Sequence, residues 1–249
     1  MNLEEYQAKG HTTVPAVFTA AEMDAAIADI ERWGEEFLRD LPASQRRWYL
    51  ESGASAAADP SKAREVLRKL DNPHFHRPSI RALAGDPRLV SLVEGAIGRG
   101  VSVYFSQIFF KAPEGGGPKP PHQDNFYFGP RDPEALITAW IAFDDATLEN
   151  GCLYFGEGTH RASLLSHAAP PAEPFNLQVS AEATAAIALT AAPVPKGGVS
   201  FHHGGVLHQS GTNRSTRWRR ACALHYVRND NAFVRPGLPY DESMYVRIT

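Results

Sequence analysis

Residues 120–128 have the sequence Pro-Pro-His-Gln-Asp-Asn-Phe-Tyr-Phe, and residues 205–215 have the sequence Gly-Val-Leu-His-Gln-Ser-Gly-Thr-Asn-Arg-Ser. Two residues separated by one position share a face of an extended strand, so His122 and Asp124 can point in the same direction. His208, in the second stretch, can join them only if the fold brings distant strands together. These two stretches therefore constrain the fold more than the rest of the chain does.

Together the two stretches can supply a metal site. Two neutral imidazoles and one carboxylate on one side of a metal form the facial triad of non-heme Fe(II) oxygenases, which leaves positions open for a co-substrate and O2. His122, Asp124 and His208 match that set. A His-x-Asp pair alone is a weak signal, because a chain with 10 histidines often contains one by chance. His202 and His203 could also compete with His208 for the third position.

The composition is that of a globular chain. Of its 249 residues 43% are hydrophobic, enough for a sizeable core in one domain. The formal net charge of −3 gives no basic field that would suggest nucleic acid or an anionic membrane as a partner. No apolar run reaches membrane-spanning length, and the N-terminus lacks a signal region. Two cysteines, Cys152 and Cys222, are no disulfide framework, so a reduced cytoplasmic setting is expected, for a monomer or a homodimer.

The first hundred residues are predicted to be mostly helical. The sequence Thr-Ala-Ala-Glu at residues 19–22 is a capping box, and apolar residues follow it at helical spacing. Asp-Pro at 59–60 is predicted to open a second helix that runs to about Leu70, with proline at the first helical position. Asp-Pro at 86–87 opens a third helix, which is predicted to end at Gly98.

From Val101 the chain changes to short segments rich in β-branched and aromatic residues, separated by glycine and proline loops. Strands are predicted at residues 101–110, 135–143, 152–155, 199–202, 206–210 and 220–228. Residues 165–195, rich in alanine and proline, are hard to place. The pattern predicts a mainly β fold with helical additions: one domain over residues 1–249, helical in 1–100, with a jelly-roll core in 101–249.

Six blocks in the strand region carry a resemblance to a known family. They are Phe110–Pro113, Pro121–Asp124, Ala139–Asp145, Glu149–Leu153, Gly158–Arg161 and Leu207–Ser215 with Arg219–Ala221. In this order they resemble the phytanoyl-CoA dioxygenase branch of the Fe(II)/2-oxoglutarate oxygenases. The resemblance covers about half of the chain and implies a double-stranded β-helix, a cupin-like jelly roll whose mouth holds the iron.

The resemblance assigns expected roles to individual residues. It makes His122, Asp124 and His208 the Fe(II) ligands, and it makes Arg219 the anchor for the distal carboxylate of 2-oxoglutarate. An arginine suits that role because its guanidinium is always charged and grips a carboxylate through two parallel hydrogen bonds. Related halogenases have a small residue in place of the carboxylate ligand, so Asp124 favours oxygenation.

Three further side chains are expected to contact 2-oxoglutarate. Ser210 shares a strand face with His208 and can donate to the same carboxylate. Trp140 resembles a pocket tryptophan of the family, with an indole N–H available, and packing in the core is the less favoured alternative. Gln107, on the strand before the metal loop, is the third.

Other residues of the same types have competing interpretations. Arg217 and Arg220 are alternatives to Arg219, but strand alternation excludes Arg220 if Arg219 points inward. His160 resembles a structural loop position of the family. His225, between apolar neighbours, is expected to be a satisfied strand histidine.

The reaction implied by the resemblance uses Fe(II), 2-oxoglutarate and O2 to hydroxylate an unactivated C–H bond, with release of succinate and CO2. Desaturation or cyclisation would begin in the same way. No Lys- and Arg-rich surface suggests coenzyme A, so the expected substrate is a small metabolite, as in secondary metabolism. Residues expected at the mouth are Asn125, Tyr127 and Phe128, with Trp48, Tyr49 and Arg161 as possible lid residues.

Two other function classes remain open from the sequence. One is a cupin-type metal-dependent isomerase or hydrolase that works without 2-oxoglutarate. The other is a non-catalytic jelly-roll binding protein. Arg219 with Ser210 argues against the first, because it needs no keto-acid anchor, and the intact triad argues against the second.

Overall fold

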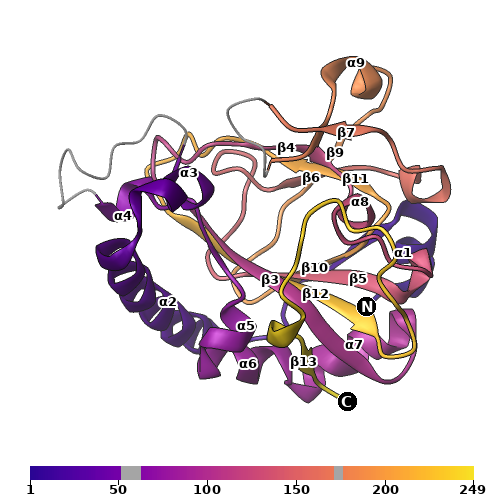
Figure 1. Cartoon of the computed structure of the whole chain (residues 1–249), viewed down its shortest axis with the longest axis horizontal. Coiled ribbons are helices and arrows are strands. Elements are labelled where there is room, and N and C mark those ends of the chain that lie inside the picture. Colours follow the sequence, from indigo (N-terminus) through magenta and orange to yellow (C-terminus); the bar gives the residue numbers. More distant parts are fainter. Residues whose placement is uncertain (52–62, 171–175) are drawn as a thin grey trace.

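The structure, a computed structural model, describes residues 1–51, 63–170 and 176–249 (Figure 1). Its centre is a double-stranded β-helix of two antiparallel sheets, which confirms the predicted jelly roll. The larger sheet contains, in spatial order, β1 (His11–Val14), β10 (Val199–His203), β5 (Leu136–Ala142), β12 (Arg219–Arg228), β3 (Val101–Lys111) and β13 (Val246–Arg247), with β2 (Lys69–Asp71) also beside β3. The smaller sheet contains β4 (Lys119–His122), β11 (Leu207–Ser210), β6 (Leu153–Gly156) and β9 (Thr190–Ala192), and a separate pair consists of β7 (His167–Ala168) and β8 (Gln178–Val179).

Helices cover the outer face of the larger sheet (Figure 1). α2 (Ala20–Asp40), α6 (Pro78–Ala84) and α7 (Pro87–Ile97) bury apolar side chains in one core with the outward residues of that sheet. The capping box at residues 19–22 and the helix bounded by Asp86 and Gly98 are confirmed. The shorter helices are α1 (Leu3–Lys9), α3 (Arg46–Tyr49), α4 (Ala63–Val66), α5 (Pro73–His76), α8 (Asp124–Phe128) and α9 (Ala181–Thr184), with 3-10 turns η1 (Ala43–Gln45), η3 (Pro133–Ala135), η4 (Thr159–Arg161) and η5 (Glu242–Met244).

Alternation along β12 separates the two cores. Cys222, Leu224 and Tyr226 pack outward beneath the helices, whereas Ala221 and Ala223 face the smaller sheet. Side chains alternate between the faces of a strand, so the residues at 219 and 225 share the inward side. The small alanines between them leave room for a cavity within the jelly roll.

The helix predicted to run from residue 59 to about Leu70 needs correction. Its start lies outside the described residues, and α4 ends at Val66. Lys69–Asp71 forms strand β2, which pairs with β3. Leu70 is fully buried in the outer core, so packing at this sheet position outweighs the local helical pattern. Strand β1, at His11–Val14, was also absent from the prediction.

Both cysteines are free and buried. Within the described residues, no helix combines the length and apolar character that crossing a membrane requires.

The C-terminal segment returns across the inner side of the jelly roll. The amide of Gly237 donates to the carbonyl of Tyr127 at 2.8 Å. His74, at α5, donates from Nε2 to the carbonyl of Met244 at 2.9 Å and accepts from the Ser106 hydroxyl at Nδ1, at 2.6 Å. A neutral imidazole with one donor and one acceptor satisfies both partners. His74 thus ties the segment after residue 233 to β3.

Protonation of His74 should weaken this connection. Burial lowers the pKa of His74 from 6.5 to about 4. Between these pH values the unfolded chain binds more protons at His74 than the folded chain does, so the free energy of unfolding should fall as pH drops from about 6.5 to about 4, with about 1 kcal/mol per pH unit contributed by His74. Urea unfolding at several pH values in this window measures the pH dependence of the free energy of unfolding. His74→Gln should show a weaker pH dependence, and an unchanged slope in that variant would assign the effect to other groups.

Candidate functional site

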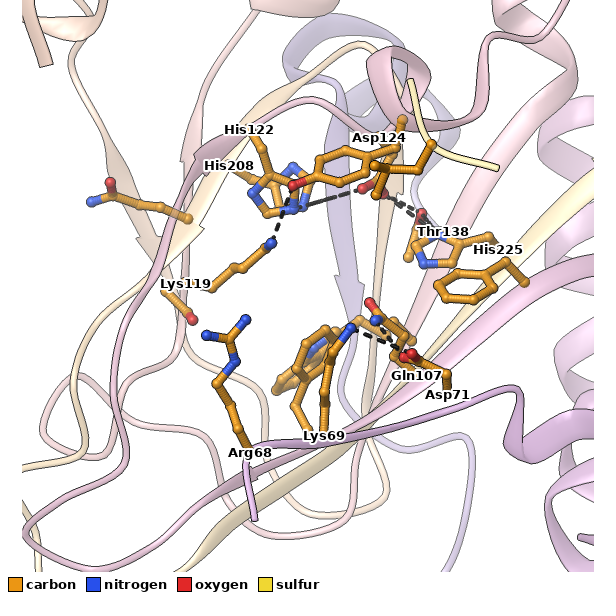
Figure 2. Close-up of a pocket in the computed structure, with 18 of the residues that line it drawn as sticks. Arg68, Lys69, Asp71, Gln107, Lys119, His122, Asp124, Thr138, His208 and His225 are labelled. Carbon is orange, nitrogen blue, oxygen red and sulfur yellow. Dashed lines mark hydrogen bonds and ion pairs between the residues drawn. The ribbon is translucent and has the colours of Figure 1, made fainter. Parts of the chain in front are cut away.

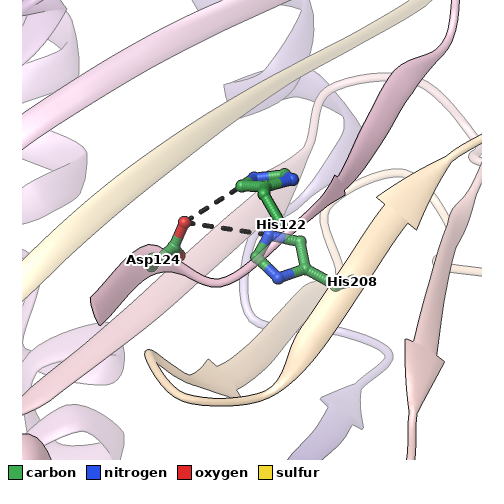
Figure 3. Close-up of side chains that lie close together, drawn as sticks. All are labelled: His122, Asp124 and His208. Carbon is green, nitrogen blue, oxygen red and sulfur yellow. Dashed lines mark ion pairs between the residues drawn. The ribbon is translucent and has the colours of Figure 1, made fainter. Parts of the chain in front are cut away.

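Three side chains from distant parts of the chain converge between the two sheets (Figure 3). His122 ends β4, and His208 lies directly opposite on the neighbouring strand β11. Asp124 is the first residue of α8. The ligand atoms lie within 4.8 Å of one another, with Asp124 Oδ1 3.7 Å from His122 Nε2 and 3.8 Å from His208 Nε2. All three residues are buried.

Backbone hydrogen bonds fix which imidazole nitrogen faces this point. Nδ1 of His122 lies 2.8 Å from the carbonyl of Pro120, and Nδ1 of His208 lies 3.1 Å from the carbonyl of Val206. A carbonyl only accepts, so each Nδ1 carries the proton and donates it. The Nε2 lone pair of each ring therefore remains available to a metal ion, and the ring orientation is held in advance.

The electrostatics of the site also suit a metal ion. Burial lowers the pKa of His208 to about 4 and holds the pKa of His122 well below its ordinary value. Burial raises the pKa of Asp124, but the nearby His208 and His225 and a hydrogen bond from His202 outweigh it, so this pKa lies well below its ordinary value. Two neutral imidazoles and an ionised carboxylate are the protonation states that metal binding requires.

Gln123, between His122 and Asp124, fixes the backbone where β4 ends and α8 begins. Gln123 is fully buried, and its side-chain amide donates to the carbonyl of Gly205 at 2.7 Å and accepts from the amide of Leu165 at 2.8 Å. Its backbone N–H donates to His167 Nε2 at 2.9 Å. The prediction that both ligands share one strand face needs correction, because the strand ends at the first and a helix begins at the second. They face one point because Gln123 fixes the chain between them.

The second oxygen of Asp124 points away from the metal position, toward the larger sheet (Figure 2). Its Oδ2 accepts from the hydroxyl of Thr138 at 2.6 Å and lies 3.2 Å from Nε2 of His202. His225 reaches the same hydroxyl through Nδ1 at 2.8 Å. His202 therefore contacts Asp124 on the oxygen that does not face the two ligand histidines. His203 points elsewhere, with Nε2 3.2 Å from Glu134.

A cavity of about 290 Å³ adjoins the three ligands (Figure 2). Aromatic side chains form much of its wall, and basic side chains from both sheets line it as well. The aromatic group includes Trp48, Phe105, Phe109, Tyr127, Phe128, Trp140 and Tyr240. The basic group is Arg68, Lys69, Lys111, Lys119 and Arg219. Burial lowers the pKa of Lys111 to about 6, so this amine is mostly neutral at pH 7. Ligand sites of enzymes commonly combine an apolar wall with a few placed charges.

Arg219 lies in this cavity as a buried cation. It is 2% exposed, and its guanidinium carbon lies 5.4 Å from the centre of the Trp140 ring. Among the described residues, Nε of Arg219 has no hydrogen-bond partner and no carboxylate forms an ion pair with its guanidinium. Burial lowers the pKa of Arg219 to about 9, which leaves it charged at neutral pH. A buried charge without a partner is costly, so the site is suited to an anionic ligand.

The neighbouring arginines occupy other positions. Arg220 points outward, where it pairs with Asp144 through Nε at 2.7 Å and also contacts Glu31. Arg217 is exposed. The alternation expected for β12 therefore holds, with Arg219 inward and Arg220 outward.

The remaining predicted site residues divide into two groups. The first group lines the cavity and consists of Ser210, Trp140, Tyr127, Phe128, Trp48 and Tyr49. Gln107 also lines it, but its side chain donates to Asp71 at 2.8 Å. The structure does not bring Asn125 to the cavity: it is buried, and its amide donates to the carbonyl of Pro133 at 3.2 Å. Arg161 is exposed and donates to the carbonyl of Gln7, in α1.

Several residues of the site were missed from the sequence. Thr138 and Gln123 were not considered, and both hold the ligand set, whereas His202, weighed from the sequence as an alternative ligand, contacts Asp124. His225 is a hydrogen-bonded strand histidine, as expected, but it also lines the cavity. Inward alternation on residues 136–142 gave a usable signal for Thr138, because it shares a face with Trp140. No sequence pattern singled out Gln123, whose partners come from two separate segments, around residues 165–167 and at Gly205.

Comparisons with known proteins show which family the chain resembles. The family model for phytanoyl-CoA dioxygenase (PhyH) matches residues 6–221. A protein of Stutzerimonas stutzeri named probable alpha-ketoglutarate-dependent hypophosphite dioxygenase is 26% identical over 243 residues, covering 91% of this chain and 77% of that protein. Phytanoyl-CoA dioxygenase domain-containing protein 1 of Mus musculus is 31% identical over 168 residues, covering 66% of this chain but only 58% of the mouse protein.

Solved structures show the same fold. The epimerase SnoN from nogalamycin biosynthesis, in a complex with Fe3+, alpha ketoglutarate and nogalamycin RO, superposes with a TM-score of 0.71. The alignment covers 96% of this chain and 91% of that chain, at 21% sequence identity. At this identity the likeness speaks for the fold alone.

Proposed function

Because the chain belongs to the phytanoyl-CoA dioxygenase family, we propose that it is an Fe(II)/2-oxoglutarate-dependent dioxygenase that hydroxylates an unactivated C–H bond of a small metabolite. The observation that carries this proposal is the placement, in one cavity, of the His122, Asp124 and His208 cluster with the buried cation Arg219. A metal-dependent isomerase or hydrolase without a keto-acid co-substrate would have no need for that buried cation.

The chain's own groups define what the site can do. His122 and His208 would each offer Nε2, and Asp124 would offer Oδ1, to Fe(II). Arg219 would hold the distal carboxylate of 2-oxoglutarate, and Ser210 lines the same cavity from β11 of the smaller sheet. When bound, Fe(II) and 2-oxoglutarate supply the O2-dependent oxidation of a C–H bond, coupled to formation of succinate and CO2. The aromatic walls exclude bulk water from the reacting position.

The size of the cavity favours a small substrate. About 290 Å³ lies at the low end of ordinary small-molecule sites, and the space has to accept 2-oxoglutarate as well as the reacting part of the substrate. The bacterial relative is named for hypophosphite, a very small anion. Tyr127 and Phe128 are the predicted mouth residues that line the cavity, so they are proposed to contact the substrate.

A screen of metabolites for stimulated succinate release tests the proposal. The purified protein with Fe(II), 2-oxoglutarate and O2 should release succinate faster when its substrate is present. Because a protein of the same fold is an epimerase, mass spectrometry of the product decides the outcome. A gain of one oxygen atom supports hydroxylation, whereas an unchanged mass with succinate release would replace hydroxylation by isomerisation.

A further inference from the structure

The two oxygens of Asp124 have different surroundings (Figure 2). Oδ1 faces Nε2 of both ligand histidines, at 3.7 and 3.8 Å. Oδ2 lies 2.6 Å from the Thr138 hydroxyl and 3.2 Å from His202 Nε2. Behind Thr138, the ring of His225 places Nδ1 2.8 Å from the same hydroxyl. Among the described residues, hydrogen bonds reach Oδ2 and none reaches Oδ1.

The directions of these hydrogen bonds follow from the protons that each group carries. An ionised carboxylate only accepts, so the single hydroxyl proton of Thr138 goes to Oδ2. His225 then has to donate its Nδ1 proton to the Thr138 oxygen. His202 has to carry its proton on Nε2, because the other tautomer would point a lone pair at the carboxylate and leave an Nδ1 proton buried without a partner. Two donors therefore converge on Oδ2.

We propose that Thr138, oriented by His225 and assisted by His202, is a positioning residue that restricts Asp124 to coordinating the metal through one oxygen. The hydrogen bonds engage Oδ2 and direct Oδ1 toward the two imidazoles. A carboxylate without them can rotate and offer both oxygens, which would occupy a position that the co-substrate or O2 needs. This inference rests on the metal site of the proposed function.

Metal binding by variants of Thr138 tests the role without any knowledge of the substrate. Thr138→Val keeps the shape of the side chain but removes the hydroxyl, whereas Thr138→Ser keeps the hydroxyl. Calorimetric titration of the metal-free proteins with Fe(II) under anaerobic conditions, or with Co(II), should show an affinity about 10- to 100-fold lower for the valine variant. The serine variant should bind nearly as tightly as the wild type.

Ser200 provides a matched control. It is another fully buried hydroxyl, on the adjacent strand β10, and within the described part of the chain its Oγ has no hydrogen-bond partner. Ser200→Ala should therefore leave the metal affinity unchanged. If Ser200→Ala lost as much metal affinity as Thr138→Val, the cause would be a general disturbance of the sheet, and the proposal would be overturned.

Two variants of His225 test the second hydrogen bond. In His225→Asn the side-chain amide can take the position of Nδ1 and donate to Thr138. In His225→Gln the amide lies nearer the position of Nε2, so this donor is lost. The asparagine variant should keep more of the metal affinity than the glutamine variant. The Tm of the metal-free protein shows whether Thr138→Val folds. If it does not fold, the two His225 variants still test whether Thr138 positions Asp124.

The outcomes separate this inference from the proposed function. Unchanged metal affinity in a folded Thr138→Val variant, or equal affinities for the two His225 variants, would refute the positioning role while leaving the metal site intact. A wild-type protein that binds neither Fe(II) nor Co(II) would refute the metal site itself. The valine variant should also give an altered electronic spectrum with Co(II), which a merely structural role would not produce.

Discussion

His208→Ala is expected to reduce 2-oxoglutarate turnover by more than about 100-fold, because loss of a direct ligand should exceed the cost of losing one of its hydrogen-bond partners. The ring of His208 provides one of three ligand atoms and has no substitute at the same position. The fold should survive, since the core around β11 comes from Val206 and Leu207, which remain. Succinate release and the Tm of the metal-free protein measure the two effects separately.

His203→Ala is the matched control for that variant. His203 is also a buried histidine from the same region, but its Nδ1 accepts from the amide of Gly205 and its Nε2 faces Glu134. The control should retain metal binding and turnover. Full activity in His208→Ala, together with loss in His202→Ala or His203→Ala, would move the third ligand to one of these positions.

Arg219→Ala is expected to raise the 2-oxoglutarate requirement by about 30-fold or more. Loss of one charge-assisted contact with a desolvated carboxylate costs on the order of 2–5 kcal/mol, and about 1.4 kcal/mol corresponds to a tenfold change in affinity. Arg219 is buried in the cavity wall with no acidic partner among the described residues, so its charge is available to a ligand. Fe(II) affinity should change little, because Arg219 is not a ligand.

Two variants sharpen this test. Arg219→Lys should recover only part of the affinity, because a point charge cannot make the two-pronged contact. Arg220→Ala removes the adjacent arginine, which is paired with Asp144 on the outer side, so it should lower stability and leave 2-oxoglutarate affinity unchanged. If Arg220→Ala weakened 2-oxoglutarate binding and Arg219→Ala did not, the assignment of the anchor would be wrong.

Much of the larger framework could be predicted because it depends on local patterns. The strands of the jelly roll have dense β-branched and aromatic residues, and the capping box at residues 19–22 marks the start of α2. Alternation along β12 correctly separates Arg219 from Arg220. The order of the sequence motifs predicted that His122, Asp124 and His208 belong together. The pairing of β4 with β11 brings the two histidines opposite each other.

What could not be predicted depends on contacts between distant segments. Strand β2 forms because Lys69–Asp71 meets the free edge of β3, which no local pattern reveals. Asn125 follows the metal motif and was expected at the mouth, but the helical turn of α8 directs it toward Pro133. The support of Asp124 by Thr138 and His225 joins two strands far apart in sequence, so only the fold brings these groups together.

Anaerobic titration of the protein with Fe(II) and then 2-oxoglutarate tests whether the site holds the metal and the keto acid together. Chelation of Fe(II) by a 2-oxo acid produces a weak charge-transfer absorption in the visible range, and we expect it to appear with a 1:1 stoichiometry. The band should be lost in His208→Ala and should require more 2-oxoglutarate in Arg219→Ala. Fe(II) binding without any such band at saturating 2-oxoglutarate would contradict the account and would favour a metal-dependent enzyme that works without a keto acid.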